Sequence, residues 1–170
     1  MTPRKIMLLG EIGVGKSSIA RRLVFDRFES DYKPTLGVDV YSYEIEPRLI
    51  TQPGAATGIR FIIWDTDGNF RDNILSHIYI KQAAGALIVG DVTRRTTLDS
   101  MIHLGRSFMS AMPGRYCGFL LNKSDLATTP DLPPALAHSP IPIVHTSAKT
   151  GENVKEAFVG AADAIRRRRL

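Results

Sequence analysis

The sequence predicts a single α/β domain, residues 1–170, in which helices cover both faces of a mostly parallel, six-stranded sheet. Strand-like and helix-like patterns alternate along the chain, which is typical of this class. Two of the strand-like runs, residues 84–89 and 116–121, are apolar throughout, as expected for strands that are buried on both faces. With 170 residues, 44% of them apolar, the chain can build a substantial core, and a disordered chain is excluded.

The first half of the chain supplies three of the expected strands. Residues 5–9 are predicted to form a short buried strand, and a helix is expected soon after it because apolar side chains recur there at helical spacing. These are Ile19, Ala20, Leu23 and Val24. Residues 38–45 and 59–64 are predicted to form two further strands. The loop between them contains two prolines and two glycines and is long for a hairpin, so we expect it to protrude.

The second half continues the alternation, with the runs 84–89 and 116–121 and a shorter strand at 141–145. A helix is predicted between the first two runs from apolar side chains at helical spacing. These are Leu98, Met101, Ile102, Phe108 and Met109. Residues 128–140 contain four prolines and can carry at most a short helix, with Pro133 or Pro134 in its first turn.

The last helix has the most regular pattern in the chain. One apolar stripe runs along it. Its members are Val154, Ala157, Phe158, Ala161 and Ile165. Asn153 or Gly151 could cap its start.

Residues 10–17 carry the pattern of a phosphate-binding loop, two glycines with four residues between them followed by Lys16 and Ser17. Glycines such as Gly13 and Gly15 let backbone N–H groups, with that of Val14 between them, approach phosphates closely. Lys16 can reach the β- and γ-phosphates, and the Ser17 hydroxyl can ligate Mg²⁺. Ser18 then lies in the first turn of a helix whose N-terminal dipole favours the same anion.

A second group of polar residues follows the strand predicted at 59–64. Asp65 stands directly after that strand, where its carboxylate can hold Mg²⁺ through water, opposite Ser17. Gly68 follows three residues later, where a backbone N–H could meet a terminal phosphate. The group is a weak signal alone and a strong one after a phosphate loop and a strand.

Two further polar motifs predict that the base is guanine. Residues 122–125 read Asn-Lys-Ser-Asp, and an ionised Asp125 can accept hydrogen bonds from N1–H and the 2-amino group of guanine. Adenine lacks both donors, and a polar pairing of this kind can discriminate by about 10⁴ or more, which disfavours a kinase or ATPase. Asn122 would steady the loops, and the stem of Lys123 would cover the base. Residues 147–149 contribute Ser147, Lys149 and the Ala148 N–H, which could donate to guanine O6.

With five motifs in this order, the chain resembles the small GTPases of the Ras superfamily, in particular the Rab-like and bacterial Ras-like branches. The resemblance implies a P-loop GTPase domain that binds GTP or GDP with Mg²⁺, hydrolyses GTP and acts as a molecular switch in signalling. It implies that Phe28 packs against guanine, that Thr35 ligates the metal and senses the γ-phosphate, and that Tyr32 closes over the phosphates. The catalytic residues would be Lys16, Thr35, Gly68 and Asn69.

The resemblance also implies protein partners. Effector, activating and exchange proteins would bind through two switch segments, at about residues 28–39 and 65–80. Four apolar residues of the second segment are candidate contacts. These are Ile74, Leu75, Ile78 and Tyr79.

Three residues around the reacting phosphate depart from the family pattern. Asn69 stands where the family usually has Gln, Ile12 is bulkier than usual, and Asp67 adds a negative charge. We therefore expect slow intrinsic hydrolysis that a partner assists. The alternative is a non-catalytic GTP-binding scaffold. Arg71 could supply a compensating charge in cis or be an ordinary solvated residue.

Charge and terminal residues limit the other partners. The net charge is +5, from 22 basic and 17 acidic residues, but four of the positive charges are Arg166–Arg169, so the balance gives no argument for nucleic-acid binding. No cysteine lies near the C-terminus and residue 2 is Thr, so no lipid anchor is expected. The arginine run could touch an anionic membrane weakly or simply suit a helix end.

The cellular location expected from the sequence is cytoplasmic. The longest clean apolar stretch, residues 83–89, is far too short to span a bilayer. The only cysteine, Cys117, cannot form an internal disulfide and is expected to be a buried apolar residue.

Overall fold

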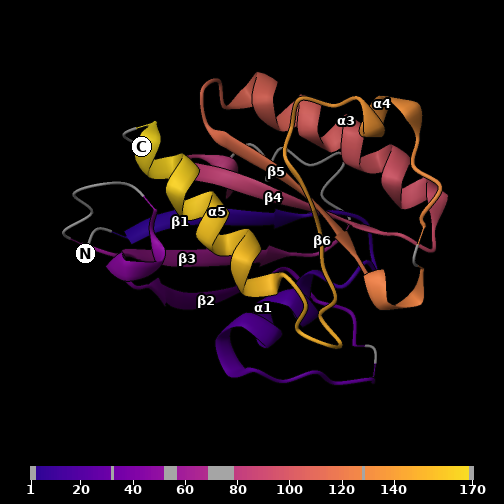
Figure 1. The fold of residues 1–170 in the computed structure, drawn as a ribbon, viewed down its shortest axis with the longest axis horizontal. Coiled ribbons are helices and arrows are strands. Elements are labelled where there is room, and N and C mark those ends of the chain that lie inside the picture. Colours follow the sequence, from indigo (N-terminus) through magenta and orange to yellow (C-terminus); the bar gives the residue numbers. More distant parts are fainter. Residues whose placement is uncertain (1–2, 32, 52–56, 69–78, 128, 169–170) are drawn as a thin grey trace.

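The computed structural model describes residues 3–31, 33–51, 57–68, 79–127 and 129–168 (Figure 1). The strands are β1 Pro3–Leu9, β2 Val38–Ile45, β3 Ile59–Thr66, β4 Ala83–Asp91, β5 Tyr116–Asn122 and β6 Ile143–His145. The helices in these ranges are α1 Lys16–Phe25, α3 Arg95–Ala111, α4 Pro134–Ala137 and α5 Val154–Arg167. Two 3₁₀ turns accompany them, η1 Pro47–Leu49 and η2 Ser124–Leu126.

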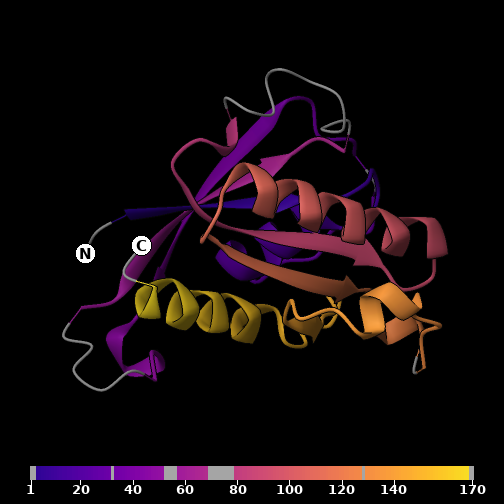
Figure 2. The same cartoon turned by 90° about the horizontal axis from the view of Figure 1, so that it is seen from above.

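The strands form one six-stranded sheet in the order β2-β3-β1-β4-β5-β6. Only the edge strand β2 is antiparallel to its neighbour, and all other pairs are parallel. Helix α3 lies on one face of the sheet and α5 on the other (Figure 2). The predicted α/β class, with its mostly parallel sheet and helices on both faces, is confirmed.

Each face of the sheet has its own apolar core, and alternate residues of one strand enter different cores. In β1, Ile6 and Leu8 pack with α1 and α5, whereas Met7 and Leu9 pack with α3. All four side chains are at most 4% exposed. This double burial explains why the central strands are apolar throughout instead of alternating with polar residues.

Strand β3 is longer than the sequence predicted, and this changes the position of Asp65. Pairing with β2 continues to the pair Val38 and Thr66, and the Thr66 hydroxyl donates to the Leu8 carbonyl at 2.8 Å. Asp65 therefore lies inside the strand and is fully buried, instead of following the strand end. The apolar pattern ends at Trp64, so it could not show that backbone pairing goes on.

The connection between β2 and β3 protrudes less than expected. Its first part forms η1, and Ile50 enters the core with 5% of its surface exposed. Thr51 then donates two hydrogen bonds to the Asp163 carboxylate of α5, from its backbone N–H at 2.9 Å and its hydroxyl at 2.6 Å. Ile50 and Thr51 thus pack against the body of the domain, and the expectation of a protruding loop was wrong for these two residues.

Several local expectations were confirmed. Helix α4 is short, with Pro133 at its N-cap and Pro134 as its first residue, and Cys117 is buried.

Asn153 occupies the N-cap position of α5, but its side chain donates to the His145 carbonyl and does not cap the helix. Within the described ranges, every helix is too short or too polar to cross a membrane.

Candidate functional site

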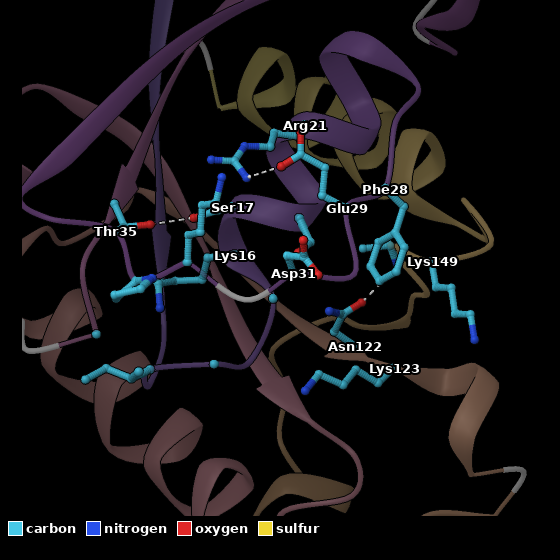
Figure 3. Close-up of a pocket in the computed structure, with 18 of the residues that line it drawn as sticks. Lys16, Ser17, Arg21, Phe28, Glu29, Asp31, Thr35, Asn122, Lys123 and Lys149 are labelled. Carbon is cyan, nitrogen blue, oxygen red and sulfur yellow. Dashed lines mark hydrogen bonds and ion pairs between the residues drawn. The ribbon is translucent and has the colours of Figure 1, made fainter.

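A cavity of about 460 Å³ opens at the carboxyl ends of the parallel strands, the edge where ligands bind in sheets of this type. Segments that follow β1, β3, β5 and β6 contribute to it, together with α1 and the segment before β2. Its lining includes Gly13, Gly15, Lys16, Ser17, Ser18, Phe28, Thr35, Gly68, Asn122, Lys123, Asp125, Ala148 and Lys149. Figure 3 shows Lys16, Ser17 and Thr35 toward one end of the cavity and Phe28, Lys123 and Lys149 toward the other.

The loop between β1 and α1 surrounds the first end. Gly15 is the N-cap of α1 with φ 101°, and a Cβ atom there would lie 2.3 Å from the Asn122 amide nitrogen. Only glycine fits both the left-handed backbone and this close approach. The loop is thereby held against β5, and the free N–H groups of the helix start face the cavity.

Lys16 is buried at this end of the cavity. Its ammonium donates to the carbonyls of Gly10 at 2.9 Å and Glu11 at 2.8 Å. Burial lowers the pKa of Lys16 to about 8, although the carboxylates of Asp65, Asp67 and Glu11 oppose the shift. The group is still mostly protonated at neutral pH, so the cavity holds a fixed positive charge.

Three oxygen donors from distant segments meet beside Lys16. The Ser17 hydroxyl lies 2.7 Å from the Thr35 hydroxyl and donates to an Asp65 carboxylate oxygen at 2.5 Å. One hydroxyl comes from α1, the other from the segment before β2, and the carboxylate from β3. The sequence motifs could predict that these residues act together, and the structure places them in contact.

These donors suit a hard cation. Within the described residues, the second carboxylate oxygen of Asp65 is buried without a hydrogen-bond partner. Burial raises the pKa of Asp65 to about 6, against the lowering effect of the Ser17 hydrogen bond and the Lys16 charge. A divalent cation would compensate this carboxylate, and Mg²⁺ prefers oxygen ligands of this kind. The residues present therefore fit the metal that the family implies.

The other end of the cavity is organised by Asn122, the last residue of β5. Its amide nitrogen donates to the Val14 carbonyl at 2.9 Å, and its amide oxygen accepts from the Ala148 N–H at 3.2 Å. Asn122 thus joins the phosphate loop to the loop after β6. The Ala148 N–H would have to share or leave this bond in order to meet guanine O6.

Asp125 reaches the same end from η2. It is exposed, and one of its carboxylate oxygens accepts from the buried Ser147 hydroxyl at 2.6 Å. Ser147 does not line the cavity itself but fixes the orientation of the carboxylate. Phe28, which is 40% exposed, and Lys149 complete the end of the cavity.

Lys123 has a partner that the motifs did not indicate. Its ammonium lies 2.7 Å from a carboxylate oxygen of Asp91, at the end of β4. Burial would raise the pKa of Asp91, but hydrogen bonds from Lys123 and Thr93 outweigh it and hold the pKa below its usual range. The ion pair therefore fixes Lys123 beside the base end of the cavity.

The two described departures from the family pattern lie on the phosphate side. Ile12 and Asp67 both line the cavity, and Ile12 is 47% exposed. A Cβ atom on Gly68 would lie 2.3 Å from the Ile12 backbone nitrogen, so the two loops touch and only glycine fits. Asn69, Arg71, Tyr32, Ile74, Leu75 and Ile78 lie outside the described residues.

Like Ser147, the predicted site residues Val14 and Asp65 do not line the cavity, whereas Arg21, which the motifs did not indicate, does. Val14 does not line the cavity, because its side chain is buried in the core below it and only its carbonyl takes part. Arg21 lines the cavity from α1 and lies 3.5 Å from Glu29. Its spacing of four residues from Ser17 is a helical repeat and could have indicated that both face the cavity.

Comparison with known proteins gives consistent matches over almost the whole chain. Residues 5–167 match the sequence model of the Ras family. The Ras-related protein RABF2b of Arabidopsis thaliana is 32% identical over 169 residues, which are 96% of this chain and 81% of that protein. The Ras-related protein Rab-31 of Rattus norvegicus is 31% identical, covering 95% and 82%. The Ras-related protein Rab-4B of the same species is 32% identical, covering 95% and 75%.

Proposed function

Because the chain belongs to the Ras family, we propose that the cavity described above is its guanine-nucleotide site and that Mg²⁺ is its cofactor. The protein is a GTP-binding molecular switch that hydrolyses GTP. We also take residues 1–170 as a single GTPase domain.

One observation carries the assignment of the site. The cavity has a cationic, N–H-rich end at the start of α1, and Phe28 and Lys123 lie toward its other end (Figure 3). Asp125 lines the cavity from η2, the turn that directly follows Lys123. A nucleotide has the complementary order, with anionic phosphates at one end and a flat base with polar edges at the other. The two ends lie on one cavity, so a single ligand can meet both.

At the phosphate end, the chain's own groups bind and orient the substrate. Backbone N–H groups of residues 13–18 and the Lys16 ammonium face the phosphates and stabilise the negative charge that develops during transfer. The Gly68 N–H meets the terminal phosphate. Ser17, Thr35 and Asp65 would hold Mg²⁺, which when bound neutralises phosphate charge and polarises the phosphoryl oxygens.

At the base end, Asp125 accepts the two N–H donors of guanine while Ser147 holds its carboxylate in place. Asn122 fixes the distance between the phosphate loop and the base loops. Lys123, anchored by Asp91, covers the base with its aliphatic stem. Equilibrium binding of fluorescent GDP, with GTP, ATP and ADP as competitors, tests the assignment. Competition by adenine nucleotides as strong as that by GTP would contradict it.

We propose that intrinsic hydrolysis is slow. Asp67 places a negative charge in the cavity, and the bulk of Ile12 lies against Gly68, where the terminal phosphate would bind. The transition state of phosphoryl transfer carries negative charge at this place, and both features disfavour it. A single-turnover measurement with Mg²⁺ and GTP tests this, and Asp67→Ala should hydrolyse faster than the native protein. The alternative of a non-catalytic scaffold is not favoured, because the chain belongs to a family of GTPases.

We propose that protein partners bind at the switch segments, about residues 28–39 and 65–80. Leu36 is 89% exposed and stands next to Thr35, which supports a contact surface that depends on the state of the nucleotide. A pull-down with GDP-loaded and non-hydrolysable GTP-loaded protein would test this surface. We further propose a cytoplasmic location, where GTP is supplied.

A further inference from the structure

A charged side chain from outside the cavity contacts the phosphate loop. Arg94, in the turn between β4 and α3, donates from its guanidinium to the Ile12 carbonyl at 3.0 Å. The same guanidinium lies 3.8 Å from the Glu11 carboxylate, so it is bound to two consecutive residues of the loop. Arg94 is not among the residues that line the cavity.

Arg94 binds the carbonyl of a peptide group whose N–H is on the side of the cavity. The Ile12 carbonyl and the Gly13 N–H belong to one peptide unit, and none of the described peptide bonds is cis. In a planar trans peptide the carbonyl and the N–H point in opposite directions. Because Arg94 holds the carbonyl outside the cavity, the Gly13 N–H is turned toward its interior, and Gly13 lines that interior.

The bond to Arg94 also changes the strength of that N–H as a donor. A charged donor on a carbonyl polarises the peptide group, and hydrogen bonds in such a chain strengthen one another. The loop is further held by Ser100 of α3, whose hydroxyl donates to the Glu11 carboxylate. The turn after β4 and the start of α3 thus support the loop from behind.

The Arg94 side chain does not cap its own helix. Arg94 occupies the N-cap position of α3, but its side chain makes no capping hydrogen bond, and Thr97 bonds to its backbone carbonyl instead. The neighbouring Arg95, the first residue of α3, has different partners. It pairs with Asp131 at 2.6 Å and with Asp99 at 3.8 Å, away from the phosphate loop.

We infer that Arg94 is a positioning residue for phosphate recognition, which acts by orienting and polarising the Ile12–Gly13 peptide group. This inference rests on the proposed nucleotide site. Its effect should be confined to ligands that carry phosphates, because the base end of the cavity has its own supports at Asn122 and Asp91.

The test compares Arg94→Ala with the matched control Arg95→Ala, each measured for binding of GDP and of guanosine by competition. We expect Arg94→Ala to bind GDP about tenfold more weakly, as for loss of one charge-assisted hydrogen bond, and to bind guanosine as the native protein does. Arg95→Ala should bind both as the native protein does. Arg94→Lys, which keeps a charged donor, should recover much of the GDP affinity.

Two outcomes would overturn the inference while leaving the nucleotide site intact. One is an equal loss of GDP and guanosine affinity in Arg94→Ala, which would indicate local unfolding. The other is full restoration of GDP affinity by adding Glu11→Gln to Arg94→Ala, because the effect would then be simple exposure of a carboxylate. Failure of the native protein to bind GDP would contradict the proposed function itself.

Discussion

Asp125, which lines the cavity, and Asp65, which is buried behind Ser17, are two carboxylates with different surroundings and different tasks. Asp125 is exposed and held by a neutral hydroxyl, which suits an acceptor for the N–H edge of a base. Asp65 is buried beside Lys16 and two hydroxyls, which suits a ligand of a cation. A separate prediction therefore follows for each of the two carboxylates.

Replacement of Asp125 should change which base is bound. Asp125→Asn removes the charged acceptor for two guanine N–H groups, each worth about 1.5–3 kcal/mol, so GDP affinity should fall by about 100-fold or more. Xanthine has a carbonyl in place of the 2-amino group, and the new amide can donate to it, so xanthosine diphosphate should gain affinity. Competition binding measures both, with the exposed Asp99→Asn as control. Unchanged preference for guanine would contradict the role of Asp125.

Binding of Mg²⁺ should weaken in mild acid because of Asp65. Its pKa is raised to about 6, so in the metal-free site a proton occupies the carboxylate below that pH and competes with the metal. At pH 5 about one tenth of the carboxylate is ionised, and Mg²⁺ affinity should be about tenfold lower than at pH 7.5. GDP release at graded Mg²⁺ concentrations measures this. Asp65→Asn reports the titration of the nucleotide alone, and an equal pH effect in that variant would contradict the prediction.

At the scale of elements, the structure depends on contacts between segments that are far apart in sequence. The strand pairing carries Asp65 into the sheet, and the connection after β2 is fastened to α5 by Thr51 and Asp163. Asp163 is only 6% exposed. Both of its oxygens are used by Thr51, so the carboxylate is compensated by neutral donors.

Loss of this contact should destabilise the protein measurably. Asp163→Ala leaves the backbone N–H and the hydroxyl of Thr51 without their partner, and we expect the free energy of unfolding to fall by about 2 kcal/mol. Urea unfolding at fixed GDP and Mg²⁺ concentrations measures it, because bound ligand changes the apparent stability. Glu156→Ala, on an exposed position of the same helix, is the control. A change under about 0.5 kcal/mol in Asp163→Ala would show that the contact contributes little.

At the scale of the whole molecule, two arginines of the C-terminal run contact other parts of the domain. Arg166 donates to the Thr57 carbonyl, and the Arg168 guanidinium lies 5.7 Å from the centre of the Tyr116 ring. Both contacts favour the interpretation of the run as a helix end that suits the dipole. They leave fewer charges free to meet a membrane.

Membrane binding through this run should therefore be weak. We expect little sedimentation with anionic vesicles at physiological salt, and an increase at low salt that disappears when residues 166–169 are changed to alanine. Neutral vesicles are the control. Strong, arginine-dependent binding at physiological salt would contradict the assignment and support a membrane contact.

The sequence by itself determined most helices and strands and the identity of most residues that line the cavity. Apolar runs and helical stripes depend on local spacing, and the phosphate and base motifs depend on residue types at fixed separations, so both can be seen in one dimension. The order of strand ends then predicts that Ser17, Asp65 and Asp125 lie along the same edge of the sheet, because parallel strands bring their carboxyl ends to one edge.

Only the tertiary structure decided which distant partners hold those residues in place. Arg22 of α1 donates to the carbonyls of Ala148 and Lys149, Lys123 pairs with Asp91, and Arg94 holds the Ile12 carbonyl. Each contact joins a side chain to a residue more than 30 positions away, and no local pattern distinguishes such an arginine or lysine from a solvated one. Its partner is fixed by strand order and helix packing, which arise when the whole chain has folded.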